Sequence, residues 1–555
     1  MGSDVHRWEG SMTRAATLVI SLAFFAFEAQ AQPRPATPQV ARQVAPLAGS
    51  RVRTPRPTFR IAQGAGAAST LEVCADRACR RVLTSIPASA EQLTPSIDLP
   101  AGVVFWRLSW SEPGAAPEGG SPHTVRSPTW PLRIARASQA SPRAQDAAVY
   151  VVSTHGAAPP RRPPMPHTMV DVIAAAGGAR RGVASGARLT GTAAGDLDGD
   201  GRADLALATT RERATLVSIV RAGARPNEAP ATFEPPSPPH AATASEPRGA
   251  TLAIGDANGD GFDDLAVAPA EIGLREEGPI VVLLYAGGPS GVSAASPARI
   301  QTPRPAPPSA GAMEHPENVA VSIAFVDVDS DGHEDLAVTS PEALRVYRGT
   351  DAGLGAPAAW SLAPPSGASF EGSRVARAGD TNGDGYDDLA VAARSTAGPF
   401  GRVLVYLGSR SGPRPEPVAL SAGEVPIGFG SAMAAAGDVD GDGFGELLVS
   451  FSGGEARQSA GVYLYRGTQR GPDPRGGTLL GSTQSPSDAF GAAIVGGRDI
   501  DGDGYADVII GAPGAVRGRG MIVIHPGRPA AASRAITTQM PGRRAGYAFG
   551  AALAW

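Results

Sequence analysis

The chain has 555 residues, of which 42% are hydrophobic, with 70 Gly, 52 Pro and a formal net charge of −4. A chain of this length holds several domains or one large repeat fold, and its Gly and Pro content with short apolar runs indicates tight turns and short strands rather than disorder. The basic residues are scattered, which excludes the clustered basic face expected of a nucleic-acid-binding protein.

The N-terminal segment is typical of an export signal. A basic residue precedes the apolar run of residues 15–27, and Ala29-Gln30-Ala31 has the small-x-small form of a cleavage site. An uncleaved membrane anchor is the alternative, but the run is short for a membrane span. We therefore expect residues 1–31 to be a signal peptide cleaved after Ala31, whether translation starts at Met1 or Met12. The mature chain is then secreted or on the cell surface, with no membrane span.

A β-rich region follows the signal. Residues 32–48 are rich in Pro, Gln and Ala, which predicts a linker. Residues 49–137 contain short alternating segments, such as 104–108, that are typical of half-buried strands. This segment and the turn before it resemble a core strand of a fibronectin type III or immunoglobulin-like domain, with Trp106 in the core. We predict a β-sandwich-like domain over 49–137 and a linker over 138–145.

The chain has two cysteines, Cys74 and Cys79. In an oxidising compartment we expect a local disulfide that closes a tight turn between two strands. Two free thiols are the alternative. A zinc site would need two further ligands, and no His lies close by in the sequence.

One pattern recurs from residue 146 to residue 555. It consists of an acidic nonapeptide followed by an apolar run, a later strand ending in Gly, and a Phe-Gly pair that opens the next unit. The nonapeptides begin at Asp196, Asp256, Asp327, Asp380, Asp438 and Asp499. Successive starts are 53 to 71 residues apart. Because each interval can hold about four short strands, which make one propeller blade, the pattern predicts an all-β fold with a β-propeller over 146–555.

The nonapeptides also predict metal sites. Each has oxygen-bearing side chains at positions one, three, five and nine, a backbone carbonyl expected to face inward at position seven, and Gly at position six, where a positive φ would select Gly. Such dense oxygen donors suit Ca²⁺, with up to six sites. The expected ligands are Asp196, Asp198, Asp200, Arg202 and Asp204; Asp256, Asn258, Asp260, Phe262 and Asp264; Asp327, Asp329, Asp331, His333 and Asp335; Asp380, Asn382, Asp384, Tyr386 and Asp388; Asp438, Asp440, Asp442, Phe444 and Glu446; and Asp499, Asp501, Asp503, Tyr505 and Asp507.

Two other kinds of loop share features with these nonapeptides. Asp and Gly are good turn residues without any metal, but six in-phase copies argue against that interpretation. An EF-hand is excluded, since it needs Glu at position twelve and flanking helices, whereas position twelve is Leu, Val or Ile here and strand-like runs follow. Like charges packed into one turn predict loops that are strained when empty, so Ca²⁺ is expected to act as a folding ligand.

The repeats resemble a known family. The pairs beginning at Phe429 and Phe490, the acidic nonapeptides and Gly511-Ala512-Pro513 look like the FG-GAP repeats of the integrin α-subunit propeller and of related bacterial repeat proteins. The resemblance covers about residues 146–555 and implies seven blades with Ca²⁺ in hairpin loops on one face. The chain departs from the pattern at Phe370, which Glu371 follows, and six loops leave six or seven blades open.

A further Phe-Gly pair at Phe549 opens a unit that reaches only Trp555. We expect residues 551–555 to form the inner strand, and residues 147–152 an outer strand, of one shared blade. This arrangement would close the ring and leave no long exposed sheet edge.

No catalytic constellation stands out in the sequence. The eight His form no His-Glu-x-x-His pair, and neither a Gly-x-Ser-x-Gly elbow nor a Walker loop is present. His333 is expected to be an exposed side chain at its variable loop position. We predict a non-enzymatic adhesion or recognition module for an unknown protein or glycan ligand. The alternatives are an extracellular hydrolase or lyase that uses the central cavity, and a purely structural envelope protein.

Overall fold

The computed structural model describes a defined subset of the chain. These residues are 42–45, 51–52, 55–62, 69–100, 102–111, 124–134, 148–154, 167–174, 179–185, 188–211, 214–222, 229–236, 249–273, 278–294, 296–304, 318–370, 373–395, 401–420, 428–451, 460–483, 486–528, 538–542 and 549–554. All of them lie in one compact unit, Val40–Trp555. The predicted signal peptide lies outside the described residues.

Two sheets form the N-terminal β region. The first has the strand order β1 (Arg42–Ala45), β3 (Phe59–Ala62), β6 (Gln92–Leu93). The second has the order β2 (Arg51–Val52), β9 (Trp130–Ile134), β7 (Gly102–Ser111), β4 (Ser69–Cys74), β5 (Val82–Pro87), with β8 (Thr124–Arg126) paired to β7. β1 lies inside residues 32–48, the segment expected to be a linker. β1 pairs with β3 through backbone groups. Because every residue type except Pro supplies both backbone groups, the Gln- and Ala-rich composition did not predict this strand.

One apolar cluster joins the two sheets. It contains Phe59 of β3, Leu93 of β6 and Trp106 of β7, and the Trp106 side chain is fully buried. The Trp106 ring centroid lies 4.8 Å from that of Phe59 and 5.0 Å from that of Trp130. The structure thus places Trp106 in the core, as predicted from the alternation of its strand.

The cysteine prediction is confirmed. Cys74, the last residue of β4, forms a disulfide with Cys79. The disulfide lies in the connection between β4 and β5, and these two strands pair antiparallel. The bond therefore closes a tight hairpin loop.

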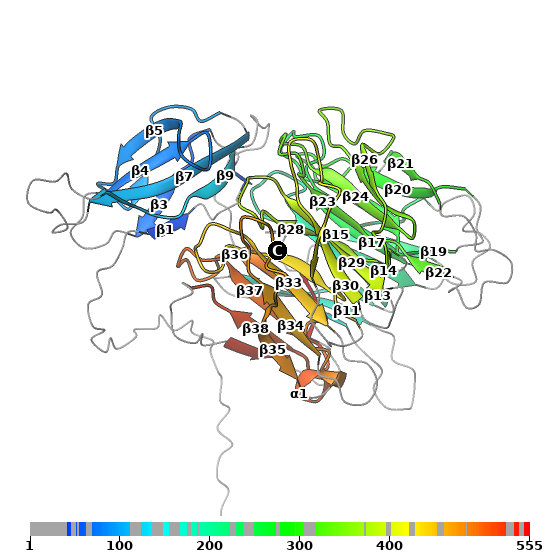
Figure 1. Cartoon of the computed structure of the whole chain (residues 1–555). Helices are drawn as coiled ribbons and strands as arrows, with labels where there is room; N and C mark the ends of the chain where they lie inside the picture. The colour runs from blue at the N-terminus through cyan, green and yellow to red at the C-terminus, as the bar shows by residue number, and fades with distance from the viewer. Residues whose placement is uncertain are drawn as a thin grey trace, which may run out of the picture. The chain divides into compact units, whose positions relative to one another are not determined.

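Seven antiparallel sheets of four or five strands follow in the described part of the chain, coloured from cyan to red in Figure 1. They comprise β10 (Ala148–Thr154), β11 (His167–Ala174) and β12 (Ala179–Ser185) with β40 (Phe549–Ala554); β13 (Arg188–Gly195), β14 (Asp204–Arg211), β15 (Ala214–Val220) and β16 (Ala231–Phe233); β17 (Ala250–Gly255), β18 (Asp264–Pro269), β20 (Ile280–Tyr285) and β21 (Ala298–Thr302); β23 (Ile323–Val326), β24 (Asp335–Ser340), β25 (Ala343–Tyr347) and β26 (Trp360–Leu362); β27 (Ala368–Ser369), β28 (Val375–Gly379), β29 (Asp388–Ser395), β30 (Gly401–Tyr406) and β31 (Val418–Leu420); β32 (Met433–Gly437), β33 (Glu446–Phe451), β34 (Ala460–Tyr465) and β35 (Thr478–Thr483); and β36 (Ala493–Arg498), β37 (Asp507–Ala512), β38 (Met521–His525) and β39 (Thr538–Pro541).

Few other elements occur among the described residues. β19 (Glu271–Gly273) pairs with β22 (Asn318–Ala320). A single 3₁₀ turn, η2 (Pro486–Asp488), and one short helix, α1 (Ala515–Gly518), both belong to the last repeat. The prediction of an all-β fold is therefore confirmed.

Each sheet packs against the next through its apolar residues. One cluster contains Ala266 of β18 and Ile323 of β23, and another contains Val346 of β25 and Leu389 of β29. Such burial contributes about 25 cal/mol for each Å² of apolar surface removed from water. The core is therefore divided into layers between neighbouring sheets, as in a propeller.

The Phe-Gly pairs lie at these layers. Phe429 and Phe490 are each 5% exposed, and the glycines that follow, Gly430 and Gly491, have φ values of +86° and +82°. A Cβ at Gly491 would lie 2.8 Å from Val462 Cγ2. The pair recurs because Phe fills the layer and only Gly permits this backbone turn beside the neighbouring strand.

The expected ring closure is present, but β10 is not the outer strand that the sequence predicted, since its sheet has the order β12, β11, β10, β40. β40 pairs antiparallel with β10, with Val151 opposite Leu553. Ala552 of β40 packs against the apolar cluster of β14 and β15, and Leu553 packs against Ile509 of β37. One strand near the end of the chain thus completes a sheet begun by residues about 400 positions earlier, and also touches the sheets on both sides.

Candidate metal centres

The six acidic nonapeptides occupy equivalent places in six sheets. Each connects the first strand of a sheet to the second, except the Asp380 loop, which connects β28 to β29 because β27 precedes them. We name each loop by its first residue, from the Asp196 loop to the Asp499 loop. The ninth residue begins the second strand and pairs with the end of the first, as Gly195 pairs with Asp204 and Gly255 with Asp264. The loops are therefore hairpin turns of one kind, as the sequence predicts.

Hydrogen bonds to carboxylates shape each loop. In the Asp499 loop, Gly504 N donates to Asp499 Oδ2 at 2.8 Å, and Tyr505 N donates to Asp503 Oδ1 at 3.0 Å. The bond from position seven to position five recurs in every loop, at 2.9 to 3.1 Å. These bonds turn the backbone back on itself and bring alternate side chains together.

The position-six glycines have the conformation that the sequence predicts. Their φ values lie between +86° and +95° at Gly201, Gly261, Gly332, Gly385, Gly443 and Gly504. Residues with a Cβ rarely adopt this region, so Gly is selected by the backbone at this point.

The position-nine carboxylates are buried, and five of the six accept from two backbone amides, whereas Asp204 accepts from one, Ala222 N at 2.8 Å. Asp335 is fully buried and accepts from Val328 N at 3.1 Å and from Gly349 N at 2.9 Å. Asp264 and Glu446 accept from the equivalent amides of their own sheets. The ninth residue therefore ties the loop to the end of the third strand, and each of its oxygens keeps a second lone pair for a metal.

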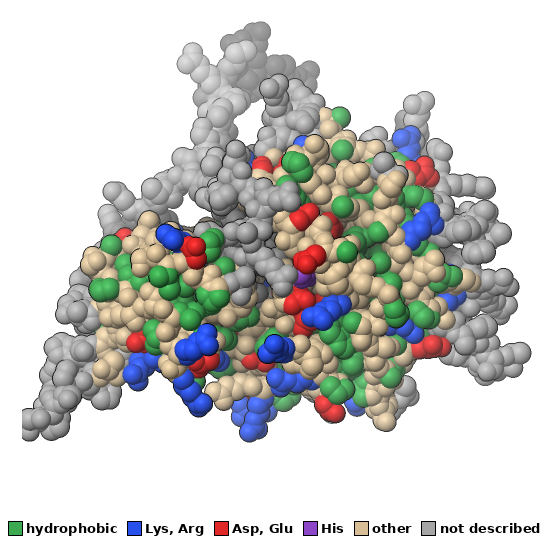
Figure 2. Space-filling model, turned by 90° about the horizontal axis from the view of Figure 1, so that it is seen from above, with side chains coloured by type: hydrophobic (Ala, Val, Ile, Leu, Met, Phe, Trp, Pro, Cys, Tyr) green, Lys and Arg blue, Asp and Glu red, His purple; other side chains and the backbone are tan. Residues whose placement is uncertain are grey.

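Four loops bring three carboxylates close enough to share one ion. In each group, one oxygen per residue lies within 4.8 Å of the others. The groups are Asp196, Asp198 and Asp200; Asp327, Asp329 and Asp335; Asp438, Asp440 and Glu446; and Asp499, Asp501 and Asp507. On the face seen in Figure 2, acidic side chains gather beside arginine side chains.

The other two loops carry an amide at position three. Asn258 Oδ1 accepts from Asp260 N at 3.1 Å, and its Nδ2 donates to Asp260 Oδ2 at 2.9 Å. Asn382 makes the same pair of contacts with Asp384. The amide thus replaces one charge while retaining an oxygen donor.

Several buried oxygens in the loops accept no hydrogen bond. They include Oδ2 of Asp204, which is 1% exposed, Oδ1 of Asp329, which is 5% exposed, and Oδ1 of Asp440. A buried carboxylate oxygen without a donor is costly unless a cation or proton meets it. The donor set, all oxygen and mostly charged, fits a hard divalent cation such as Ca²⁺.

Burial and mutual repulsion also shift the pKa values of these carboxylates. Burial, followed by the charges of neighbouring carboxylates, raises the pKa of Asp335 to about 9 and that of Asp438 to about 8. The pKa of Asp204 is raised to about 7, again chiefly by burial. The raised pKa values show that these buried carboxylates are unfavourable as anions without a positive partner. Several such carboxylates at one point are typical of a metal site, because the ion supplies that positive charge.

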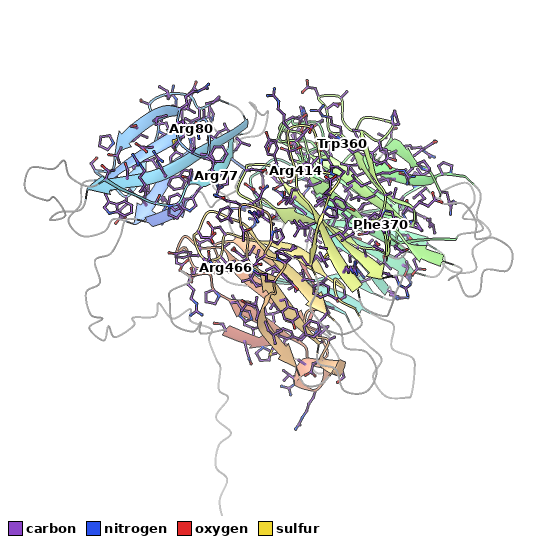
Figure 3. The ribbon with its side chains drawn as sticks, in the orientation of Figure 1. Arg77, Arg80, Trp360, Phe370, Arg414 and Arg466 are labelled. Carbon is purple, nitrogen blue, oxygen red and sulfur yellow. A yellow bond between two sulfur atoms is a disulfide. The ribbon has the colours of Figure 1, made fainter. Side chains whose placement is uncertain are left out.

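Arginines that were not among the predicted site residues lie against the loops. Arg466 Nη2 contacts carboxylate oxygens of Asp440 and Asp442, the latter at 3.3 Å, and Arg414 Nη2 lies 3.3 Å from Asp384 Oδ2 (Figure 3). Arg221 and Arg348 make similar contacts in the Asp196 and Asp327 loops. A signal was available, because Arg221, Arg348 and Arg466 each directly follow the third strand of their sheet.

The position-seven side chains do not share one environment. Arg202 is exposed, Tyr386 and Phe444 are half-buried, and Phe262 and Tyr505 are buried. The expectation that His333 is exposed is wrong: it is 4% exposed. Its Nε2 lies 2.8 Å from Asp351 Oδ1 and its Nδ1 lies 3.2 Å from Asp331 Oδ1. These two carboxylates pair with the imidazole and hold the ring against the loop.

Comparisons with known proteins agree with the repeat geometry. A family model described as an FG-GAP-like repeat matches residues 327–391 and 380–449. A second, described as an FG-GAP repeat, matches residues 189–223, 248–283 and 490–525. Each matched segment includes all or part of one or two of the hairpin loops described above.

The curated relatives include integrin α subunits. Integrin alpha-PS5 of Drosophila melanogaster is 35% identical over 170 residues, which are 27% of this chain and 16% of that protein. Integrin alpha-IIb of Homo sapiens is 38% identical over 153 residues, which are 24% of this chain and 14% of that protein. The similarity therefore spans about a sixth of these relatives or less.

Among solved structures, one described as the Dos1 propeller has a TM-score of 0.32 at 11% identity and covers 82% of this chain and 92% of that one. A score this low supports no conclusion. In the part of the chain that the structure describes, no helix is long and apolar enough to cross a membrane. The matched repeats, their hairpin loops and the ring of antiparallel sheets make this chain an all-β propeller protein that carries FG-GAP repeats similar to those of integrin α subunits.

Proposed function

We propose that the chain is an exported, calcium-dependent recognition or adhesion module whose seven-bladed propeller, over residues 146–555, binds a protein or glycan ligand. The main support for a bound metal is that buried carboxylate oxygens without hydrogen-bond donors belong to groups of three potential metal ligands. The relatives named as integrin α subunits support recognition as the role. Removal of residues 1–31 and a non-enzymatic role belong to the same proposal.

The ions would be held by the six loops. Side-chain oxygens of positions one, three and five, the position-seven carbonyl and the position-nine carboxylate form each ligand set, as named in the sequence analysis. A bound Ca²⁺ would supply positive charge that links the end of the first strand to the start of the second. The chain's own contribution is to hold these oxygens together through backbone hydrogen bonds before the ion arrives.

The test is a calcium titration of the purified mature protein. Thermal melting in Ca²⁺ and in chelator, with bound metal counted by elemental analysis, should give up to six ions per chain and a higher Tm in Ca²⁺. The double variant Asp438→Asn, Asp442→Asn should lose one ion. Asp473→Asn, outside the loops in an exposed pair with Arg475, is the control and should lose none. No bound calcium and identical melting curves would refute the metal role.

The recognition role needs a separate experiment. The calcium-loaded protein would be applied to glycan and protein arrays, and binding should disappear in chelator. Hydrolysis or lysis of an arrayed polysaccharide would instead favour an enzyme.

A further inference from the structure

The hairpin loop between β4 and β5, which the Cys74–Cys79 disulfide closes, contains Arg77. Within this loop, Asp76 accepts from Arg80 N at 3.1 Å and from Arg81 N at 2.9 Å, and Cys79 N donates to the Asp76 carbonyl at 2.8 Å. The disulfide and these bonds fix the backbone on both sides of Arg77. The backbone of Arg77 is therefore held in one conformation, which lowers the conformational entropy lost when its side chain binds to another part of the protein.

Arg77 bridges two of the acidic loops. Its Nη1 donates to the carbonyl oxygen of Gly383 in the Asp380 loop, and its Nη2 donates to that of Gly443 in the Asp438 loop at 3.1 Å. Its Cζ lies 4.5 Å from the ring centroid of Phe444. Two carbonyls and one aromatic face match the planar, forked guanidinium group and would fit an ammonium less well.

Neighbouring residues of the N-terminal β region extend this contact. Trp130 Nε1 lies 3.4 Å from the Gly441 carbonyl. A Cβ at Gly385 would lie 2.4 Å from Val103 Cγ1, and one at Gly443 would lie 2.8 Å from the Thr129 carbonyl. The glycines at position six thus serve the contact as well as the turn, because a side chain there would collide with the N-terminal region.

The charges are complementary. Burial lowers the pKa of Arg77, while Asp380, Asp384, Asp442 and Asp438 act in the opposite direction and favour its charged form. The carboxylates of both loops thus favour the charged guanidinium, and the two carbonyls accept its hydrogen bonds.

We propose that the Asp380 and Asp438 loops form a guanidinium-binding site that Arg77 of the same chain fills, and that this contact docks the N-terminal β region on the metal loops. A linked proposal, which rests on the proposed function, is that calcium in these two loops strengthens the docking. The two loops contain eight carboxylates, Asp387 included, against the four positive charges of two Ca²⁺ ions, so the site stays acidic when loaded. The ions would also hold in place the loop backbone that carries the two carbonyls.

The test is hydrogen exchange measured by mass spectrometry on the full mature chain. In calcium, Arg77→Ala should raise the exchange rate at least severalfold both in residues 75–81 and in residues 438–446. Arg77→Lys should give an intermediate increase, because the lysine ammonium keeps the positive charge but lacks the two N–H groups of the guanidinium that reach both carbonyls. Arg80→Ala is the matched control from the same loop, since the Arg80 side chain is exposed (Figure 3), and should leave both segments unchanged.

Equal exchange in Arg77→Ala and Arg80→Ala would overturn the docking proposal. The linkage is tested by repeating the wild-type measurement in chelator, where exchange of residues 75–81 should approach that of Arg77→Ala in calcium. Unchanged exchange there would overturn the linkage alone. Bound calcium is counted in the same samples, so a failure of metal binding is separated from a failure of docking. Matching melting temperatures of the two alanine variants would show that neither result comes from global unfolding.

Discussion

Arg348 Nη2 lies 2.6 Å from Oδ2 of Asp329, a carboxylate whose side chain is 1% exposed, in an ion pair that lacks the alignment of a hydrogen bond. The same guanidinium nitrogen also lies 3.0 Å from Asp331 Oδ2. Arg348 thus provides the Asp327 loop with positive charge from its own sheet. A calcium ion at this loop would have to share or replace that contact.

Replacing Arg348 should therefore strengthen calcium binding at its loop. Because a partly exposed ion pair contributes about 1 kcal/mol or less, Arg348→Gln should lower the calcium concentration needed for the thermal shift by up to about fivefold. In chelator, the same variant should melt earlier than wild type, since its carboxylates then lack any cation.

Arg345→Gln is the matched control for this prediction. Arg345 lies in β25, the strand that Arg348 directly follows, and donates to the Ser340 hydroxyl rather than to a loop carboxylate. Its calcium dependence should equal that of wild type. A weaker calcium response in Arg348→Gln would mean that the arginine assists the ion instead of competing with it.

A substitution at Gly332 tests the effect of the positive φ at position six without a steric clash from the new side chain. Its φ is +95°, and a Cβ there would have no atom within 4 Å. Gly332→Ala should lower the free energy of unfolding by about 1–2 kcal/mol from backbone strain alone. Gly288→Ala, where the nearest atom would be 3.9 Å away and φ is not in the left-handed range, should stay within about 0.5 kcal/mol of wild type. Equal denaturation midpoints for the two variants would contradict the role given to position six.

Metal-free protein should lose stability as pH rises. Burial raises the pKa of Asp507 to about 6, that of Asp204 to about 7 and that of Asp335 to about 9, against about 4 in the unfolded chain. The folded state therefore binds these protons more tightly, and the stability they contribute is present below about pH 4 and lost through about pH 9. Melting in chelator at pH 5, 7 and 9 should show falling Tm, and saturating calcium should remove the trend. A Tm in chelator that rises over this range would contradict the assignment.

Ring closure should carry measurable stability. Leu553 is 8% exposed and packs against Ile509 and Ile522 of the neighbouring sheet. Leu553→Ala should lower the free energy of unfolding by about 3 kcal/mol, and deletion of residues 545–555 should lower Tm further. Leu479→Ala in β35 is the control, because Leu479 is 47% exposed. A deletion variant that melts like wild type would show that the ring does not depend on β40.

Features set by local pattern could be predicted from the sequence. The hairpin loops, the positive φ of Gly443 and its equivalents, the Cys74–Cys79 bond and the β10–β40 pairing all follow from repeats or from neighbours in the chain. Each depends on a few consecutive residues or on one repeated unit. The metal ligands themselves stay a prediction.

Contacts between side chains from distant segments that no repeat relates could not be predicted. Arg466 reaches Asp440, 26 positions earlier in the sequence, because the third strand of its sheet ends beside the loop; its place after that strand is a sequence signal, but the carboxylate that it meets is not. His333 is buried because Asp351 approaches it from outside the nonapeptide. Arg77 contacts Gly383 and Gly443, which are more than 300 positions away in the sequence. Arg77 lies outside the repeats, so the repeat pattern does not relate it to these glycines.

The pairing of β10 with β40 has a consequence for synthesis. A ribosome adds roughly 5–20 residues per second, so β10 waits about 20–80 s for the partner strand made roughly 400 residues later. During that interval the nascent sheet keeps an open edge that can recruit other extended chains. The completed sheet, and with it the protection of this edge, therefore depends on residues that are made last.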